Sequence, residues 1–278
     1  MSVTAFAWRL GELSLTGWSR AGDASWFRVH PPGLAFDAGR GAQELVGAQD
    51  VFLSHGHLDH ALGVPWLVSQ RTGHRFEQTR VFCPREIEPE IAGLLEATAR
   101  LECVSYQVEL RGLDPGDTVA VGRGLSIEAF PTDHVVPSLG YHLIRERAHL
   151  LPELRDWPAA EIAARKKRGE PVARSERELW FSYCGDTGAA VFDLEPRVFS
   201  TRVLLLECTF FGATHRDHGV RFKHLHLEDV AARAADFANE ALLLSHVSRR
   251  YRAADVIAEV GQRLPELAAR VHVLVPED

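Results

Sequence analysis

Cysteine is scarce in this sequence, and its cysteines lack the close spacing that binds zinc in small structural domains. Cys83, Cys103, Cys184 and Cys208 are scattered along 278 residues without a Cys-x-x-Cys pair. Their spacing therefore predicts neither a cysteine-based zinc finger nor a disulfide framework. Isolated thiols suit a reducing compartment, so we expect a cytoplasmic protein. We expect Cys184 to be a small buried residue rather than a redox-sensitive thiol.

Long apolar runs are also missing. No run approaches the roughly 20 residues that cross a bilayer, and the first ten residues lack the basic start and apolar stretch of a signal peptide. We therefore expect no membrane partner. No repeat or low-complexity linker interrupts the chain. With 46% hydrophobic residues, residues 1–278 can bury a large core, and we expect them to form one domain.

An overall excess of basic residues is absent too, since the formal net charge is −7. This argues against the broad basic footprint of many nucleic-acid-binding proteins. The charge is uneven, however. Residues 145–180 contain nine Lys/Arg and seven Asp/Glu, a balance of +2 that leaves −9 for the rest of the chain. A local patch in this segment could still bind phosphate groups.

Short apolar runs that end in a polar residue dominate what is present. Runs of this kind occupy residues 33–39, 50–55, 203–207 and 241–246, and they predict buried strands with a polar or ligating residue at the end. Apolar spacing of three to four predicts helices over 87–100, 227–239 and 253–264. Residues 114–117, Asp-Pro-Gly-Asp, predict a turn between strands. The pattern indicates an α/β fold with its chemistry on loops.

One cluster of metal-binding side chains stands out after the strand predicted over 50–55. His55, His57, Asp59 and His60 are four of six consecutive residues. Imidazole and carboxylate together favour zinc or a similar first-row metal over calcium or magnesium. A polar surface turn is the alternative interpretation, but it does not explain this density of ligands. The cluster predicts a metal site.

Three further residues can complete that site. His134 follows the apolar run 125–130, and His246 follows the run 241–245. Asp186 lies between small residues after another apolar run, and its two oxygens could bridge two metals. Its alternative role is to cap a turn or helix. With seven ligands, two metal ions could share a hydroxide.

The order of these motifs resembles the metallo-β-lactamase superfamily and, within it, the tRNase Z (ribonuclease Z) family in its short, plant-like form. The similarity extends from about Gly17 to Tyr251, with specific stretches at 35–40, 54–60, 137–141, 206–210 and 245–251. It implies an α/β metallo-β-lactamase αββα sandwich with a short inserted basic arm. It also implies a first zinc bound by His55, His57 and His134, a second bound by Asp59, His60 and His246, and Asp186 as the bridge. Two Zn²⁺ ions are expected, although Mn²⁺ and Fe suit the same ligands.

The resemblance also assigns the chemistry. A hydroxide held by the metals attacks the phosphodiester, and Asp59 orients it or accepts its proton. His224 matches the general acid that protonates the departing 3′-oxygen, and Glu207 matches the acidic partner that orients this imidazole or raises its pKa. His226 is the rival acid, and its alternative is a solvent-facing residue in a first helical turn. Leu225 and Val247 depart from the residue types usual in the family.

A long Gly/Pro-rich arm that binds tRNA is common in the family and is missing here. Residues 145–180 are the candidate for a reduced arm, with phosphate contacts expected from Arg165, Lys166, Lys167 and Arg168. The alternative is an ordinary solvated helix face. Ser138 and Arg250 are weaker candidates for RNA contact, and Arg250 and Tyr251 could equally pack the site. Resemblance alone predicts a homodimer.

These features lead to one main hypothesis and two alternatives. The main one is a zinc-dependent endoribonuclease that removes the 3′ trailer of precursor tRNA, leaving a 3′-hydroxyl on the tRNA. The first alternative is a small-molecule phosphodiesterase, or another metallo-hydrolase, of the same fold. The second is a catalytically silent RNA-binding protein, against which the complete ligand set argues.

Overall fold

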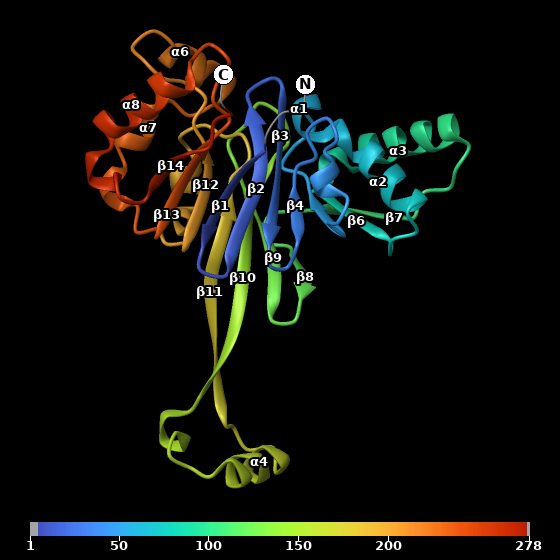
Figure 1. The fold of residues 1–278 in the computed structure, drawn as a ribbon, viewed down its shortest axis with the longest axis vertical. Coiled ribbons are helices and arrows are strands. Elements are labelled where there is room, and N and C mark those ends of the chain that lie inside the picture. Colours follow the sequence, from blue (N-terminus) through green and yellow to red (C-terminus); the bar gives the residue numbers. More distant parts are fainter. Residues whose placement is uncertain (1–4, 277–278) are drawn as a thin grey trace.

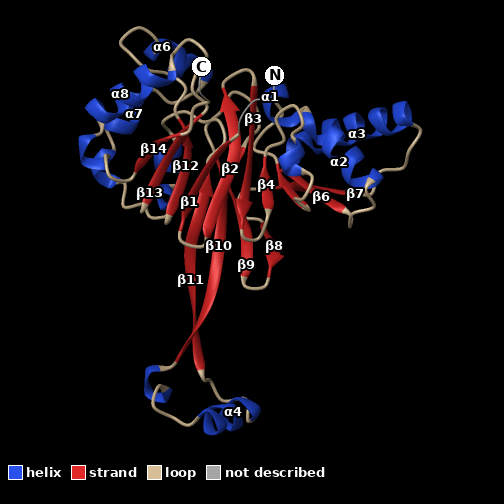
Figure 2. Cartoon of the chain, in the orientation of Figure 1, coloured by secondary structure: helices blue, strands red, loops and turns tan. Residues whose placement is uncertain are grey.

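Two seven-stranded β-sheets lie face to face, with helices against both outer faces (Figures 1 and 2). The computed structural model describes residues 5–276. The strand order is β1-β2-β3-β4-β5-β6-β7 in the first sheet and β14-β13-β12-β11-β10-β9-β8 in the second. This arrangement confirms the predicted αββα sandwich.

The strands of the first sheet are β1 (Phe6–Leu10), β2 (Leu13–Arg20), β3 (Ala24–His30), β4 (Leu34–Phe36), β5 (Asp50–Phe52), β6 (Thr79–Pro84) and β7 (Val108–Leu113). Those of the second are β8 (Thr118–Gly122), β9 (Leu125–Pro131), β10 (Leu139–Leu150), β11 (Ala173–Tyr183), β12 (Val203–Glu207), β13 (Ala241–Ser245) and β14 (Val271–Val273). The α-helices are α1 (Leu58–Ala61), α2 (Gly63–Gly73), α3 (Glu88–Glu102), α4 (Ala159–Lys167), α5 (Val191–Leu194), α6 (Arg216–Phe222), α7 (Leu227–Ala231) and α8 (Ala253–Arg263). Short 3-10 turns are η1 (Gln43–Leu45), η2 (Arg85–Ile87), η3 (Pro152–Leu154), η4 (Pro196–Phe199), η5 (Ala234–Asp236) and η6 (Pro265–Leu267).

The central strands are apolar on both faces because each one separates two cores. Along β12, Leu205 faces the core between the sheets, whereas Leu204 and Leu206 face the core under α5, α7 and α8. In β5, Phe52 faces inward and Val51 packs beneath α2 and α3. Side chains alternate along a strand, so a strand covered on both faces becomes a continuous apolar run.

The predicted polar strand ends meet at one edge of the sandwich. Strands β4 to β7 are parallel to one another, and so are β11 to β14. Parallel strands bring their carboxyl ends to the same edge, where ligands of open α/β sheets commonly bind. The loops after β4, β5, β11, β12 and β13 therefore converge there.

The hairpin of β10 and β11 extends far beyond the rest of the second sheet (Figure 1). Its outer half is exposed and carries η3 and α4. The site edge lies where β10 begins and β11 ends, so the arm occupies the opposite end of the hairpin. Twelve residues of β10 correspond to a separation of roughly 40 Å.

Two sequence predictions need correction or detail. The helix predicted over 227–239 is wrong in length, because α7 ends at Ala231 and is followed by η5 and a loop. In that loop the buried Asn239 donates to the carbonyl oxygens of Val198 and Thr201. The turn at 114–117 is confirmed, but it passes the chain from β7 in one sheet to β8 in the other.

Within residues 5–276, no helix is both long and apolar enough to cross a membrane.

Candidate metal centre and active site

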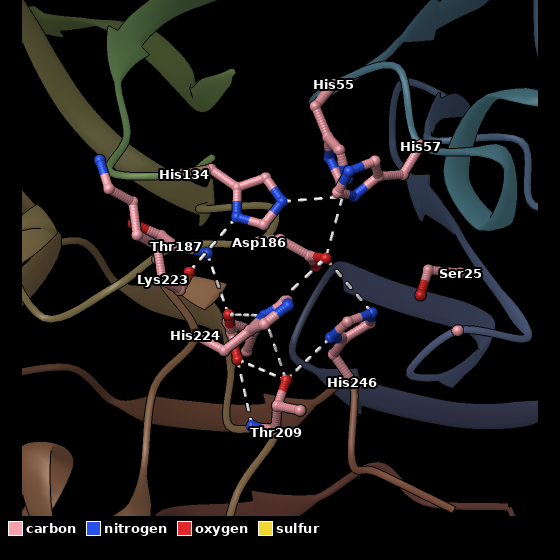
Figure 3. Close-up of polar contacts among 12 residues, drawn as sticks. Ser25, His55, His57, His134, Asp186, Thr187, Thr209, Lys223, His224 and His246 are labelled. Atoms are coloured by element: carbon pink, nitrogen blue, oxygen red, sulfur yellow. Dashed lines mark hydrogen bonds and ion pairs between the residues drawn. The ribbon is translucent and has the colours of Figure 1, made fainter. Parts of the chain in front are cut away.

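Two of three overlapping groups of potential metal ligands lie side by side at the carboxyl ends of the strands. Figure 3 shows the first of the two together with His246 of the second. The first group is His55, His57, His134 and Asp186, and the second is Asp59, His60 and His246, with the ligand atoms of each group within 4.8 Å of one another. These are the two sets, with the bridge, that the family resemblance implies. The structure thus assembles all seven predicted side chains at one place.

Asp186, a member of the first group, also faces the second. Its Oδ2 is 3.7 Å from His55 Nε2 and 3.4 Å from both His60 Nε2 and His246 Nε2. Gly185 directly before it has a φ of 61°, and a Cβ at that position would lie 2.5 Å from the Ser54 Cβ. Only glycine fits there, because the chain must turn closely past Ser54 to direct Asp186 into the site.

The first group has the chemistry that a metal requires. His55 is fully buried, and its Nε2 has no hydrogen-bond partner among the described residues. Burial lowers the pKa of His55 well below its usual value and also lowers the pKa values of His57 and His134. Neutral imidazoles offer a free lone pair, which is the form that binds first-row metals. The residues present therefore fit a bound metal ion.

Charge is concentrated in the second group. Burial lowers the pKa of His60, but Asp186 and Asp37 outweigh it and raise that pKa well above the usual value. Burial raises the pKa of Asp59, but a hydrogen bond with His246 and the nearby histidines bring it down to about 2. Asp59 is thus a carboxylate, and the backbone N–H of Gly22 also donates to its Oδ2 over 2.9 Å. Asp59 and Asp186 both lie beside His60 and His246, and a cation is the natural complement of these two carboxylates.

Hydrogen bonds at Nδ1 select the tautomer of several imidazoles. His60 bonds Asp37 Oδ2 over 2.7 Å, His246 bonds Thr209 Oγ1 over 2.9 Å, and His134 bonds the Lys223 carbonyl over 3.3 Å. In the neutral imidazole, which is the form that binds a metal, a donating Nδ1 leaves the lone pair on Nε2.

His224 and Glu207 form a pair next to this centre. Their Nδ1 and Oε1 atoms are 2.7 Å apart, and Glu207 is buried. Burial lowers the pKa of His224, but the Glu207 carboxylate outweighs it and raises the pKa to about 9. The raised pKa favours the imidazolium, in which Nδ1 faces Glu207 and Nε2 carries a proton that can be donated. The predicted partnership of these two residues is present in the structure.

Glu207 is itself held in place by its neighbours. The backbone N–H of Thr187 donates to Oε1 over 3.0 Å, and the Thr209 hydroxyl donates to Oε2 over 2.7 Å. Since His246 also bonds this hydroxyl, Thr209 links the His224–Glu207 pair to the second ligand group (Figure 3). No local sequence signal marks Thr209, because its role depends on three segments that meet only in the fold.

Asp37 is the second residue that sequence reasoning missed. Its fully buried carboxylate accepts from Ser54 N, Ser54 Oγ, His60 Nδ1 and Tyr183 Oη, at 2.7, 2.8, 2.7 and 2.5 Å. It thereby fixes one potential ligand directly and supports the turn that begins the metal-binding cluster. Asp37 and His246 both adopt left-handed backbone conformations, with φ of 55° and 61°. Such strain costs about 1–3 kcal/mol per residue and is concentrated at functional sites.

Comparison with known proteins identifies the family. Residues 23–247 match the model of the Beta-lactamase superfamily domain. Ribonuclease Z of Natronomonas pharaonis is 30% identical over 253 residues, or 78% of each chain. The chain belongs to the ribonuclease Z family of the metallo-β-lactamase superfamily. The tRNase Z TRZ1 of Arabidopsis thaliana is 28% identical over 244 residues, or 87% of each chain. The structure of human tRNase Z, short form, has a TM-score of 0.62 with 17% identity, and the match covers 94% of this chain and 95% of that one.

The two departures from the usual ribonuclease Z pattern are both in the core. Leu225 and Val247 are fully buried and pack among the residues under α7 and α8. The Leu225 carbonyl oxygen also accepts the backbone N–H groups of Thr209 and Phe210. The altered side chains therefore do not point at the metal-binding groups, and the backbone at Leu225 still supports the loop after β12.

The predicted RNA contacts occupy different settings. Arg250 is exposed at the rim of a pocket beside His224, whereas Tyr251 donates to the Phe211 carbonyl and so packs the loop. Ser138 is half-buried, and its hydroxyl pairs with Thr132 over 2.7 Å. RNA binding by Ser138 and Arg250 remains a prediction.

His226 does not occupy a solvent-facing position, so that interpretation was wrong. It is 2% exposed and is the N-cap of α7. Its Nδ1 accepts the Glu228 N–H over 3.1 Å, and its Nε2 donates to the Gly212 carbonyl over 2.8 Å. Both ring nitrogens are used in the fold, which leaves His224 as the better candidate for the acid.

His226→Ala is expected to destabilise the protein without changing catalysis. Loss of a helix N-cap typically costs about 1 kcal/mol, and urea unfolding measures this change. The rate of phosphodiester cleavage by the folded variant should equal that of the parent. A large fall in that rate at full foldedness would transfer the acid role to His226.

Proposed function

We propose that this protein is a zinc-dependent endoribonuclease that removes the 3′ trailer of precursor tRNA. Membership of the ribonuclease Z family supports this proposal. The observation that carries it is the His224–Glu207 pair, with Nδ1 and Oε1 2.7 Å apart, beside two groups of potential metal ligands. Cleavage of a ribose–phosphate bond needs a proton donor for its alkoxide leaving group, and His224 is positioned to supply one.

His55, His57 and His134 would hold one zinc, Asp59, His60 and His246 the other, and Asp186 would contact both. Zinc bound in this way supplies Lewis acidity and a hydroxide nucleophile at neutral pH. Asp59, kept ionised by its neighbours, orients the nucleophile or accepts its proton at a carboxylate oxygen. His224 Nε2 delivers a proton to the departing 3′-oxygen. Glu207 holds the imidazole and stabilises its charged form.

The direct test uses purified, zinc-loaded protein and an end-labelled precursor tRNA. We expect one cut at the 3′ side of the tRNA body, with a 3′-hydroxyl on the tRNA and a 5′-phosphate on the trailer. An intact precursor together with turnover of a small phosphodiester would replace the proposal with the small-molecule phosphodiesterase. If Asp59→Ala retains both precursor cleavage and turnover of the small phosphodiester, the proposed site is refuted.

We propose that residues 145–180 form the arm that binds tRNA at a distance from the cut. The arm occupies the far end of the β10–β11 hairpin (Figure 1). It therefore reaches either a remote part of the same tRNA or a substrate bound to a second copy of the chain. A homodimer would permit the latter, and light scattering would measure it. Localisation to the cytoplasm is also part of the proposal.

The four basic residues of the arm are not equivalent. Arg165 and Arg168 both pair with Glu170, and the Arg165 guanidinium lies 5.6 Å from the Trp157 ring centroid. Lys166 and Lys167 are exposed and have no ion pair among residues 5–276. The two lysines are therefore the better candidates for phosphate contact, whereas the arginines also shape the arm.

Lys166/Lys167→Ala is expected to weaken precursor tRNA binding and to flatten its salt dependence. Each lost phosphate contact should reduce the slope of log K against log salt by about 0.7–0.9. Turnover of bis(p-nitrophenyl) phosphate should stay unchanged, because the arm is remote from the site. Arg100/Arg123→Ala, which removes the same charge from exposed positions elsewhere, is the matched control. Equal losses in the two variants would contradict a specific role for the arm.

A further inference from the structure

We propose that Phe222 is the platform on which one base of the RNA stacks, namely the base of the nucleotide whose 3′-oxygen departs. This inference rests on the proposed nuclease function and adds a substrate contact to the same site. It assigns a role to an aromatic residue that lies outside the metal-binding groups and outside the His224–Glu207 pair.

Phe222 is an aromatic side chain without a core to fill. It ends α6, is 42% exposed and belongs to none of the buried clusters of residues 5–276. Its ring contacts are with His218 and Arg221 of the same helix, with a ring-centroid distance of 6.3 Å to His218. Because it fills no core, the ring is available to a ligand in the pocket that it lines.

The ring lines a pocket of about 510 Å³ beside the site. Apolar surface comes from Phe222, Phe210 and Val135, the last being 49% exposed. Positive charge comes from the exposed Arg249 and Arg250, and none of the described lining residues is Asp or Glu. A flat apolar wall with nearby arginines complements a nucleobase and its phosphates. The volume falls within the range of small-ligand sites.

The chemistry of His224 decides which nucleotide enters this pocket. His224 lines it, and because Nδ1 is bonded to Glu207, the proton it can donate is on Nε2. The oxygen that receives this proton is the 3′-oxygen of the nucleotide on the tRNA side of the cut. The sugar and base of that nucleotide must therefore lie on the His224 side of the site, where Phe222 provides the aromatic surface.

The test is a cycle that combines Phe222→Ala with removal of one base. Zinc-loaded parent and variant are compared on precursor tRNA with either a normal or an abasic last tRNA nucleotide. We expect Phe222→Ala to lower kcat/KM on the normal substrate by about five- to 150-fold, the loss of one base–aromatic stack. On the abasic substrate the variant and the parent should react equally, because the stack is already missing.

Control variants and substrates separate a contact from a structural effect. Phe222→Tyr should restore the parent rate, and Val220→Ala, which shortens a 77% exposed apolar side chain on the same helix, should leave it unchanged. An equal loss on both substrates would overturn the proposed stack, and so would a loss that disappears only when the first trailer nucleotide is abasic. If the parent leaves every precursor intact, the nuclease function itself fails and the inference fails with it.

Discussion

Replacing His224 with alanine is expected to slow precursor tRNA cleavage by about a hundred- to ten-thousand-fold, the usual contribution of a positioned general acid. The departing 3′-oxygen is a poor leaving group without a proton. Bis(p-nitrophenyl) phosphate expels a stabilised phenolate that needs no proton, so its turnover should change little. The ratio of the two activities, measured on folded and zinc-loaded protein, reports the acid function. Asp59→Ala, which should abolish both activities, is the contrasting control.

Glu207→Gln refines this test through the pH profile. The Glu207 carboxylate raises the pKa of His224, so neutralising it should lower that pKa. The alkaline limb of precursor cleavage, where the imidazolium loses its proton, should therefore move to lower pH. An unchanged limb would mean that another group donates the proton.

Replacing Asp37 with alanine is expected to weaken both the fold and the metal site. Four donors would lose their buried acceptor, and removal of one partner from a buried charged network costs about 3–5 kcal/mol. His60 would also lose the bond that orients it, and loss of such support lowers metal affinity by about 10–100-fold. Urea unfolding and competition with a zinc chelator measure the two effects separately.

Asp50→Ala is the matched control for Asp37→Ala. Asp50 is a buried carboxylate at the start of β5 and binds Arg80 through both oxygens at 2.6 Å, at the opposite end of the strand from the site. Its loss should destabilise the protein and leave zinc affinity unchanged. If zinc affinity falls in both variants, and in the same proportion to the loss of folding stability, Asp37 has no specific effect on the metal site.

Local spacing made much of the site predictable. His55, His57, Asp59 and His60 share one short loop, so their meeting requires only that β5 ends before them. The strands were predictable for a similar reason, since a sheet covered on both faces requires continuous apolar runs such as 203–206. The end of α7 was not predictable, because the chain leaves the helix to bring Asn239 to carbonyl groups of the segment after α5.

The sequence by itself determined the fold class, the family and the set of residues able to bind metal, because these depend on residue type, order and spacing. Only the tertiary structure decided how those residues are supported. Asp37 and Thr209 matter through hydrogen bonds to residues distant in sequence, and His226 caps a helix instead of facing solvent. Phe222 gained a proposed role only when α6 placed it in the pocket that His224 lines. Hydrogen bonds and shared pockets require side chains to lie close together in space. The packing of the two sheets decides which residues distant in sequence do so.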